Sequence, residues 1–422
     1  MVKQYVKQAL YQFRENPLIA GLSVGGTALA VAVVLVMVLV FQINTAGFAP
    51  ESNRNRLLYV LAAQVQSSSG GNSGGFSTEV LQECFYSLKI PEAVCGYARG
   101  THSLSLPHKR LYQSYVVCGT DQNYWRIFDH TFVEGIPFTE ADVQSGIRKA
   151  VLSEQTARDL FGKESAVGKE VWIDMQPCQV CGVAKDVPNP LMVSYGQVWM
   201  PYSCFPEWVT PISYAENMPG AFSACLLARS PKDFEDIQDE LLQQVQRYNS
   251  TKKDATLSFP AGCFTQIDTA MGSDGFQKVD LKQYMADQGS LLLFLLLVPA
   301  LNLIALVQSS LQKRVEETGL RRAFGATRGD VVRQVLSENL VMTLIGAAIG
   351  ILLSLVLIYV AKSFLLNSGI QLTWPMLIRP GLFLAAFLLA LLLNILSAML
   401  PAWRVMRHPI VEALHGSESE KK

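Results

Sequence analysis

Long apolar blocks alternate with polar sequence along this chain of 422 residues. Four blocks contain no charged residue, and they cover residues 18–43, 291–307, 340–360 and 382–400. A helix rises about 1.5 Å per residue, so roughly 20 apolar residues cross a hydrocarbon layer of about 30 Å. The pattern therefore predicts four transmembrane helices. The first block is longer than the apolar region of a secretory signal, which indicates a retained anchor.

The residues ahead of the first block predict a helix that lies in the membrane interface. Val2, Val6 and Phe13 fall on one side of a helix over residues 1–16, whereas Lys3 falls on the other. Pro17 then opens the first transmembrane helix, predicted over residues 17–45. Proline is favoured at that position because its missing N–H needs no partner there.

Between the first and second blocks, short alternating runs predict strands and capped amphipathic segments predict helices. Ser153 with Glu154 predicts the start of a helix that Gly162 ends. Residues 167–173 and 178–186 predict a pair of strands. Alternation of strands with helices predicts a large mixed α/β extracytoplasmic domain in two lobes over residues 46–286.

Two further segments of this domain carry specific expectations. Ser230–Pro231 predicts the start of a helix with proline at its first position. Its buried face is expected to hold Phe234, Ile237, Leu241, Leu242 and Val245. Residues 67–75 are rich in serine and glycine, so we expect a flexible loop there.

Small residues recur at helical spacing in two of the predicted spans. Gly21 and Gly25 lie four residues apart in the first, and Gly346 and Gly350 in the third. Glycine at this spacing lets another helix backbone approach closely. The partner helix belongs either to the same chain or to a second copy, and the sequence favours neither.

The positions of the positive charges predict the orientation in the membrane. Lys and Arg are concentrated before the first span, between spans two and three, and in the tail. The positive-inside rule therefore places both termini and residues 313–333 in the cytoplasm and the large domain outside. The formal net charge is zero, so nothing indicates binding to nucleic acid.

All eight cysteines lie in the segment between the first two spans, which fits an oxidising compartment. They are Cys84, Cys95, Cys118, Cys178, Cys181, Cys204, Cys225 and Cys263. Structural disulfides and buried free thiols both remain open. Cys178 and Cys181 fall on one predicted strand and face opposite sides of it, so they are not expected to pair with each other.

The basic segment between spans two and three predicts a short helix over about residues 313–327. Leu320, Ala323 and Phe324 form an apolar stripe beside Arg321 and Arg322. A second helix is expected to start after Thr327, which with Asp330 has the spacing of an N-cap. On spacing alone this segment could serve only to orient the chain in the membrane.

The motif E-T-G-L-R-R-A-F-G-A-T-R over residues 317–328 resembles the hallmark segment of the MacB/FtsX-type ABC transporter permeases. The tail from Pro401 to Leu414 and the outer segment around residues 132–139 and 150–186 are similar to the same family. In that family the short helix is a coupling helix that docks on an ATPase subunit. The resemblance places the following residues on it: Glu317, Gly319, Leu320, Arg321, Arg322, Ala323, Phe324, Gly325 and Ala326. Thr318 departs from the usual aliphatic residue.

The resemblance implies an FtsX-like transmembrane region over residues 287–405 and a cytoplasmic tail over 406–422. It implies a permease subunit that uses ATP hydrolysis by a separate cytoplasmic ATPase to export or extract a periplasmic or membrane-embedded substrate. The alternative is an FtsX-like, non-transporting regulator of a cell-wall hydrolase. No ATP-binding P-loop is present in the sequence, so ATP is expected on the partner, and neither a cofactor nor enzyme activity is expected here.

The family also implies partners and a location. The expected partners are the ATPase, a second copy or related permease, a periplasmic adaptor or outer-membrane partner, and membrane lipid. The expected location is the bacterial inner membrane, as a multi-pass protein.

Overall fold

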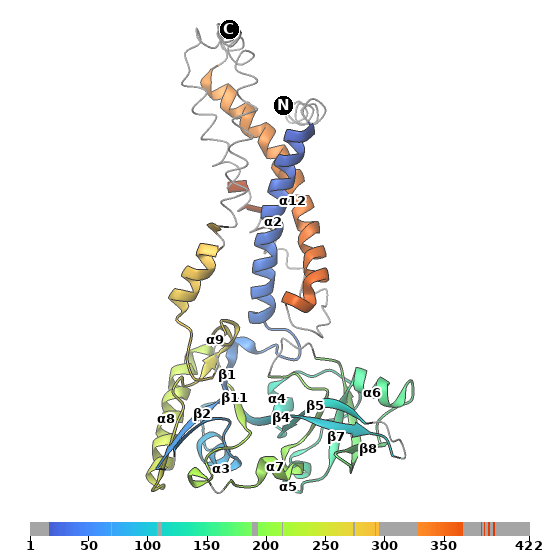
Figure 1. The fold of residues 1–422 in the computed structure, drawn as a ribbon, viewed down its shortest axis with the longest axis vertical. Coiled ribbons are helices and arrows are strands. Elements are labelled where there is room, and N and C mark those ends of the chain that lie inside the picture. The colour runs from blue at the N-terminus through green and yellow to red at the C-terminus, as the bar shows by residue number, and fades with distance from the viewer. Residues whose placement is uncertain are drawn as a thin grey trace. The chain divides into compact units, whose positions relative to one another are not determined.

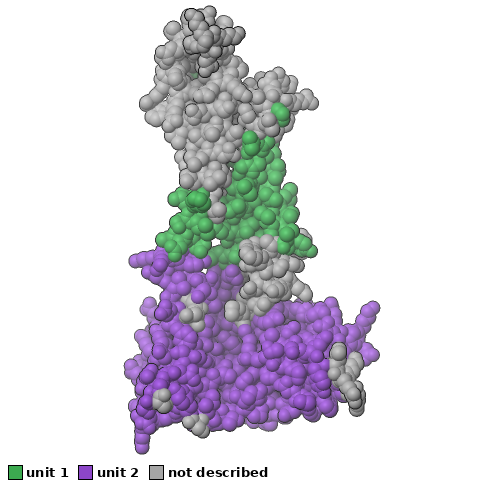
Figure 2. Space-filling view, viewed as in Figure 1, with its two compact units in different colours: residues 1–41, 285–368, 372–422 green, residues 42–284, 369–371 purple. Residues whose placement is uncertain are grey.

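The computed structural model describes residues 17–68, 70–107, 112–187, 193–212, 214–272, 275–291, 293–294, 327–365 and six isolated positions between 381 and 392. The chain divides into two compact units, which Figure 2 colours separately. The first unit comprises residues 1–41, 285–368 and 372–422, and the second comprises 42–284 with 369–371.

Two long helices form most of the described part of the first unit. Helix α2 (Pro17–Thr45) runs from this unit into the second, and α12 (Arg328–Leu365) begins directly after Thr327, as its predicted N-cap requires. Both contain stretches long and apolar enough to cross a membrane, at Ala20–Gln42 and Leu340–Val360. The second and fourth predicted spans, the helix over residues 1–16 and the tail lie wholly or mostly outside the described residues.

A ten-stranded mixed sheet is the centre of the second unit (Figure 1). Its order is β13-β1-β11-β4-β5-β10-β7-β9-β6, and β8 pairs with both β4 and β9. Only β5 with β10 and β7 with β9 run parallel among the described pairs. The strands are β1 (Leu57–Val60), β4 (Ala93–Ser105), β5 (Gln113–Thr120), β6 (Phe132–Gly135), β7 (Lys149–Ser153), β8 (Glu170–Ile173), β9 (Gln176–Ala184), β10 (Val198–Pro201), β11 (Ser223–Leu227) and β13 (Phe264–Thr265).

A second sheet has three antiparallel strands in the order β12-β2-β3. They are β2 (Ala63–Ser67), β3 (Gly70–Gly74) and β12 (Ala255–Ser258). The expectation of a flexible loop over residues 67–75 is therefore wrong, because Gly70–Gly74 pairs with β2 along its length. This strand forms through backbone hydrogen bonds to β2, because glycine has no side chain that would hinder the pairing.

Short helices connect the strands, and α8 (Phe234–Ser250) is the longest of those described in this unit. The others are α3 (Thr78–Val80), α4 (Tyr124–Ile127), α5 (Glu140–Gln144), α6 (Glu154–Phe161), α7 (Pro206–Val209) and α9 (Gln266–Ala270), with single turns η1 (Arg54–Arg56), η2 (Leu81–Phe85), η3 (Tyr202–Cys204), η4 (Ala215–Asn217) and η5 (Pro231–Asp233). Ser153 accepts the N–H of Thr156 and caps α6 as predicted, and Gly162 ends that helix with a positive φ of 69°, which glycine adopts without strain.

Three apolar cores fill the second unit. One contains α8 and η2, one lies on the opposite face of β1, β11 and β4, and the third lies around β7, β9 and α6. The mixed α/β character is confirmed, although one sheet runs through the unit without a break between the predicted lobes. On α8, Ile237, Leu241 and Val245 are buried as expected, but Leu242 is 42% exposed. One residue advances a helix by about 100°, which turns Leu242 away from the core.

Candidate functional site

The predicted coupling residues lie outside the described residues. This applies to all nine positions from Glu317 to Ala326 that the resemblance marks. The structure describes the chain again from Thr327, at the start of α12. The coupling helix therefore stays a prediction from the sequence.

The glycines of α12 contact α2 within the first unit. A Cβ atom on Gly346 would lie 2.8 Å from the Cβ of Thr27, and one on Gly350 would lie 2.6 Å from the carbonyl oxygen of Ala28. Real Cβ atoms do not approach other atoms this closely, so any larger residue would force the helices apart. Gly346 and Gly350 thus mark a close helix contact inside the chain.

The glycines of α2 have a different environment. Gly21 and Gly25 are exposed, and no described atom lies within 4 Å of a Cβ built on either one. Their spacing equals that of Gly346 and Gly350, yet they take no part in the α2–α12 contact. A role for Gly21 and Gly25 in contact with a second copy stays a prediction.

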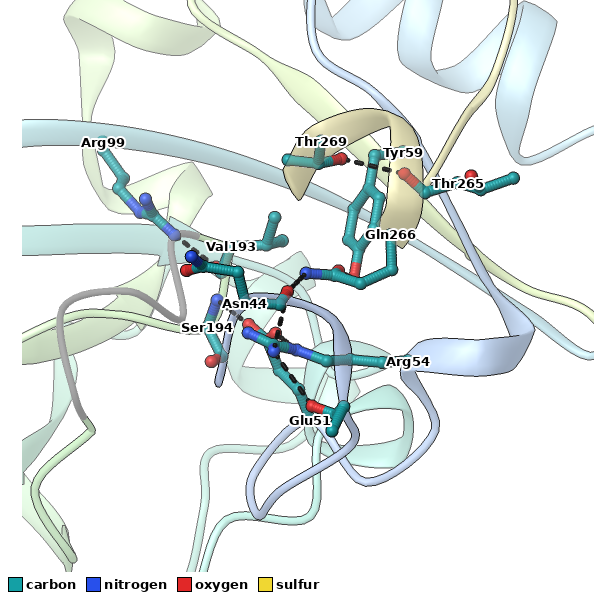
Figure 3. A network of polar contacts seen from close by, with 11 residues as sticks. Asn44, Glu51, Arg54, Tyr59, Arg99, Val193, Ser194, Thr265, Gln266 and Thr269 are labelled. Atoms are coloured by element: carbon teal, nitrogen blue, oxygen red, sulfur yellow. Dashed lines mark hydrogen bonds and ion pairs between the residues drawn. The ribbon is translucent and has the colours of Figure 1, made fainter. Parts of the chain in front are cut away.

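A buried polar network holds the last turn of α2 to the sheet of the second unit (Figure 3). We call it the junction, and it consists of Asn44, Ala46, Glu51, Arg54, Tyr59, Ser194 and Gln266. The Arg54 side chain is 1% exposed. Its Nε donates to Glu51 Oε2 at 2.7 Å, and its Nη1 donates to the carbonyl oxygens of Asn44 at 3.2 Å and Ala46 at 3.0 Å.

Arg54 therefore caps the C-terminal end of α2. The last carbonyl groups of a helix have no partner within the helix and carry the negative end of its dipole. A guanidinium group that donates to two of them is favourable in hydrogen bonding and in charge. Because Arg54 begins η1, directly before β1, this cap connects the helix end to the strand next to the edge strand β13 of the sheet.

Glu51 is the counter-ion of Arg54, and its side chain is 2% exposed. Its second oxygen, Oε1, accepts the backbone N–H of Ser194 at 3.0 Å. Arg99 of β4 donates to the carbonyl oxygen of the neighbouring Val193 (Figure 3). A buried ion pair needs such additional hydrogen bonds to offset the loss of hydration, and here both partners have them.

Gln266 joins two segments that are far apart in the sequence. It is the first residue of α9, the helix that precedes the return of the chain toward the second predicted span. Its Nε2 donates to the carbonyl oxygen of Asn44 at 2.7 Å, and its Oε1 accepts the hydroxyl of Tyr59 at 2.8 Å. Burial and then the Glu51 carboxylate raise the pKa of Tyr59, so its hydroxyl keeps the proton that it donates.

This junction was not predicted from the sequence. The sequence contains one local signal of it. Glu51 and Arg54 lie three residues apart directly after a predicted membrane span, and oppositely charged residues at this spacing can form an ion pair on one helical turn. No local signal connects Gln266 with Asn44, since 222 residues separate them.

The described residues offer no arrangement for metal binding, because no group of three His, Cys, Asp or Glu side chains converges among them. His102 Nδ1 lies 2.5 Å from Asp174 Oδ2, and the ring of His102 packs against Phe205 and Trp208. His130 packs among Tyr124, Trp125 and Trp199. Both histidines have structural roles in this fold.

Two family descriptions match the chain. Residues 20–244 match the MacB-like periplasmic core domain, and residues 289–410 match the FtsX-like permease C-terminal region. The first match covers more than half of the chain.

Two curated relatives are similar to about 70% of the chain. The chain is 25% identical to the ABC transporter permease YknZ of Bacillus subtilis strain 168 over 309 residues, which are 71% of this chain and 69% of that protein. It is 28% identical over 305 residues to the macrolide export ATP-binding/permease protein MacB of Escherichia coli K12, covering 70% of this chain. The matched region spans only 42% of that MacB protein.

Two solved structures of outer domains align with part of the chain. The extracellular domain of YknZ from Gram-positive bacteria aligns with a TM-score of 0.35 and 19% identity, covering 47% of this chain and 99% of that one. The periplasmic region of MacB from Actinobacillus actinomycetemcomitans aligns with a TM-score of 0.34 and 18% identity, covering 49% and 92%.

Proposed function

Because the chain belongs to the family of ABC transporter permeases with a MacB-like periplasmic core domain and an FtsX-like C-terminal region, we propose that it is the permease subunit of such a transporter. A separate cytoplasmic ATPase binds and hydrolyses ATP, and the membrane helices carry the resulting movement to the extracytoplasmic domain. That domain then exports or extracts a substrate that is already outside the cytoplasm or within the membrane. The chain itself catalyses no reaction and needs no cofactor.

The junction is the observation that supports this proposal. Helix α2 is continuous from Pro17 to Thr45, and Arg54 and Gln266 hold its last turn to the strands of the second unit. A flexible linker at this point would absorb a movement of the helix. A buried ion pair whose two partners both make further hydrogen bonds transmits the movement instead, because bending this connection would leave buried charged groups without their partners.

The remaining parts of the proposal concern assembly and location. The protein lies in the bacterial inner membrane with four spans and with both termini in the cytoplasm. It works as a dimer with itself or a related permease, and the outer domain meets a periplasmic adaptor or an outer-membrane partner.

The test is to purify the tagged full chain from its own membranes and identify the proteins bound to it. We expect an ABC ATPase whose ATP hydrolysis in lipid rises when the permease is present. Arg54→Met should keep the ATPase bound and reduce substrate movement per ATP hydrolysed. A preparation without any ATPase would refute the proposal, and activation of a co-purified cell-wall hydrolase without transport would replace it by the regulatory function.

A further inference from the structure

Two thiols face each other across neighbouring strands in the middle of the large sheet. Cys95 of β4 and Cys225 of β11 are direct register partners in an antiparallel pair. Both are fully buried. The other six cysteines have no cysteine as register partner in the described strands.

The hydrogen bonds of β11 define the type of this pair. The N–H of Ala228 donates to the carbonyl oxygen of Arg56, so even-numbered residues of β11 exchange hydrogen bonds with β1. Odd-numbered residues direct their N–H and C=O groups toward β4, as Leu227 does in accepting from Glu92. Cys225 and Cys95 therefore form a hydrogen-bonded pair, for which the Cα–Cα separation is about 5.5 Å. Disulfides span Cα separations of about 4.4–6.8 Å and Cβ separations of about 3.5–4.5 Å. The structure holds both cysteines as free thiols. Opposed Cβ atoms in a hydrogen-bonded pair lie about 5.5 Å apart, so closing the bond must draw the two strands together by about 1 Å.

The environment of the two thiols determines when they can react. Burial and a hydrogen bond with the Cys225 thiol raise the pKa of Cys95, and a protonated thiol is a poor nucleophile. Neither sulfur is accessible to another protein once the sheet has formed. Oxidation must therefore accompany folding, before β11 and β4 close over the pair.

We propose that Cys95 and Cys225 form a disulfide that links β4 to β11, with the other six thiols remaining reduced. This inference rests on the proposed function in one respect, because that function places the domain in an oxidising compartment. The oxidant is a protein disulfide of the thiol–disulfide exchange class. One cysteine thiolate attacks it to form a mixed disulfide, and the second thiolate displaces the carrier. Two electrons and two protons pass from the two thiols to the carrier, which leaves as a dithiol.

The test uses the full chain in membranes prepared without reductant. Free thiols are alkylated under denaturing conditions, and the protein is digested and analysed by mass spectrometry. We expect one linked peptide pair that contains Cys95 and Cys225 and alkylation at the remaining six of the eight cysteines. Reduction should lower the Tm of the domain by roughly 5–15 °C, since the cross-link no longer restricts the unfolded chain.

The double variant Cys95→Ala/Cys225→Ala should show no shift on reduction, whereas Cys84→Ser should keep the linked peptide. A linked peptide with any other partner would overturn the proposal, and so would eight alkylated thiols. A cysteine introduced at the exposed Ser145 reports the topology separately, through labelling by an impermeant maleimide in spheroplasts. Eight free thiols with Ser145 labelled would refute the disulfide alone, whereas an unlabelled Ser145 would refute the membrane orientation as well.

Discussion

Arg54 and Glu51 form an ion pair at 2.7 Å in which neither side chain is more than 2% exposed. Of the eight ion pairs found among the described residues, this one alone has both side chains so deeply buried. Its position at the end of α2 gives it a role beyond stability. It joins the last turn of α2 to the loop at Ser194 within the second unit.

Replacing Arg54 by Met should destabilise the second unit by about 3–5 kcal/mol, because Glu51 is then left buried without its counter-ion. The second change Glu51→Gln should recover part of this loss, since it removes the unpaired charge. Denaturant unfolding of the full chain in detergent, followed by tryptophan fluorescence, measures both effects.

Arg158→Met provides the matched control, because it breaks a pair with Glu154 in which the arginine is 62% exposed. Exposed pairs contribute about 0–1 kcal/mol, so this variant should unfold almost as the wild type does. Equal losses for Arg54→Met and Arg158→Met would contradict a structural role for the junction.

Gly350→Leu should weaken the contact between α2 and α12, because its side chain would overlap the backbone of Ala28. Cysteines introduced at Val31 and Ala347, which belong to one apolar cluster, should cross-link efficiently in the parent chain and poorly in this variant. Gly25→Leu is the control, since the space around Gly25 is open in the described structure. Poor cross-linking already in the parent chain would show that the two helices do not meet there in the membrane, and unchanged cross-linking in Gly350→Leu would show that the contact does not need a glycine at this position.

Local signals in the sequence predicted those elements that local forces determine. Ser153 and Gly162 delimit α6 as expected, because caps act within one turn. The separation of Cys178 and Cys181 onto opposite faces also follows from strand geometry, and the structure assigns them to different cores.

Long-range pairing explains what the sequence could not predict. The glycine-rich segment Gly70–Gly74 forms a strand only because β2 is beside it, and glycine's own preference gives no sign of this. Gln266 becomes part of the junction only after the chain has returned to Asn44. The buried state of Arg54 likewise depends on the end of α2 and on the loop at Ser194, both outside its own turn.

His130 should make the second unit less stable in mild acid. Burial among aromatic rings lowers the pKa of His130 to about 3, compared with about 6.5 in an unfolded chain. The unfolded state therefore binds a proton below about pH 6.5 that the folded state does not bind, and stability is lost as the pH falls from there toward 3. At pH 5 the titration of His130 lowers the free energy of unfolding by about 2 kcal/mol.

His130→Phe keeps an aromatic ring and removes the titration. Its free energy of unfolding should fall less than that of the wild type between pH 7 and pH 5, with both measured by denaturant unfolding. Identical pH profiles for the two proteins would mean that His130 takes up its proton in the folded state.

Phe324→Asp should disrupt docking of the ATPase. The predicted coupling helix presents Leu320, Ala323 and Phe324 on one face, and a charge placed in such a dry apolar contact costs several kcal/mol. The double change Arg321→Glu/Arg322→Glu should weaken docking less, because charges at the rim of an interface remain partly hydrated. Co-purification of the ATPase and permease-dependent ATP hydrolysis measure both variants.

Lys421→Glu, a charge change near the end of the chain, is the control and should retain the complex. None of these changes falls in a predicted membrane span, so membrane insertion and unfolding of the second unit should match the wild type. Measuring membrane insertion and unfolding therefore shows whether a variant has lost docking of the ATPase or has failed to fold. If Phe324→Asp kept both the ATPase and its hydrolysis, the segment would not be a docking helix, and its basic residues would serve only to orient the chain in the membrane.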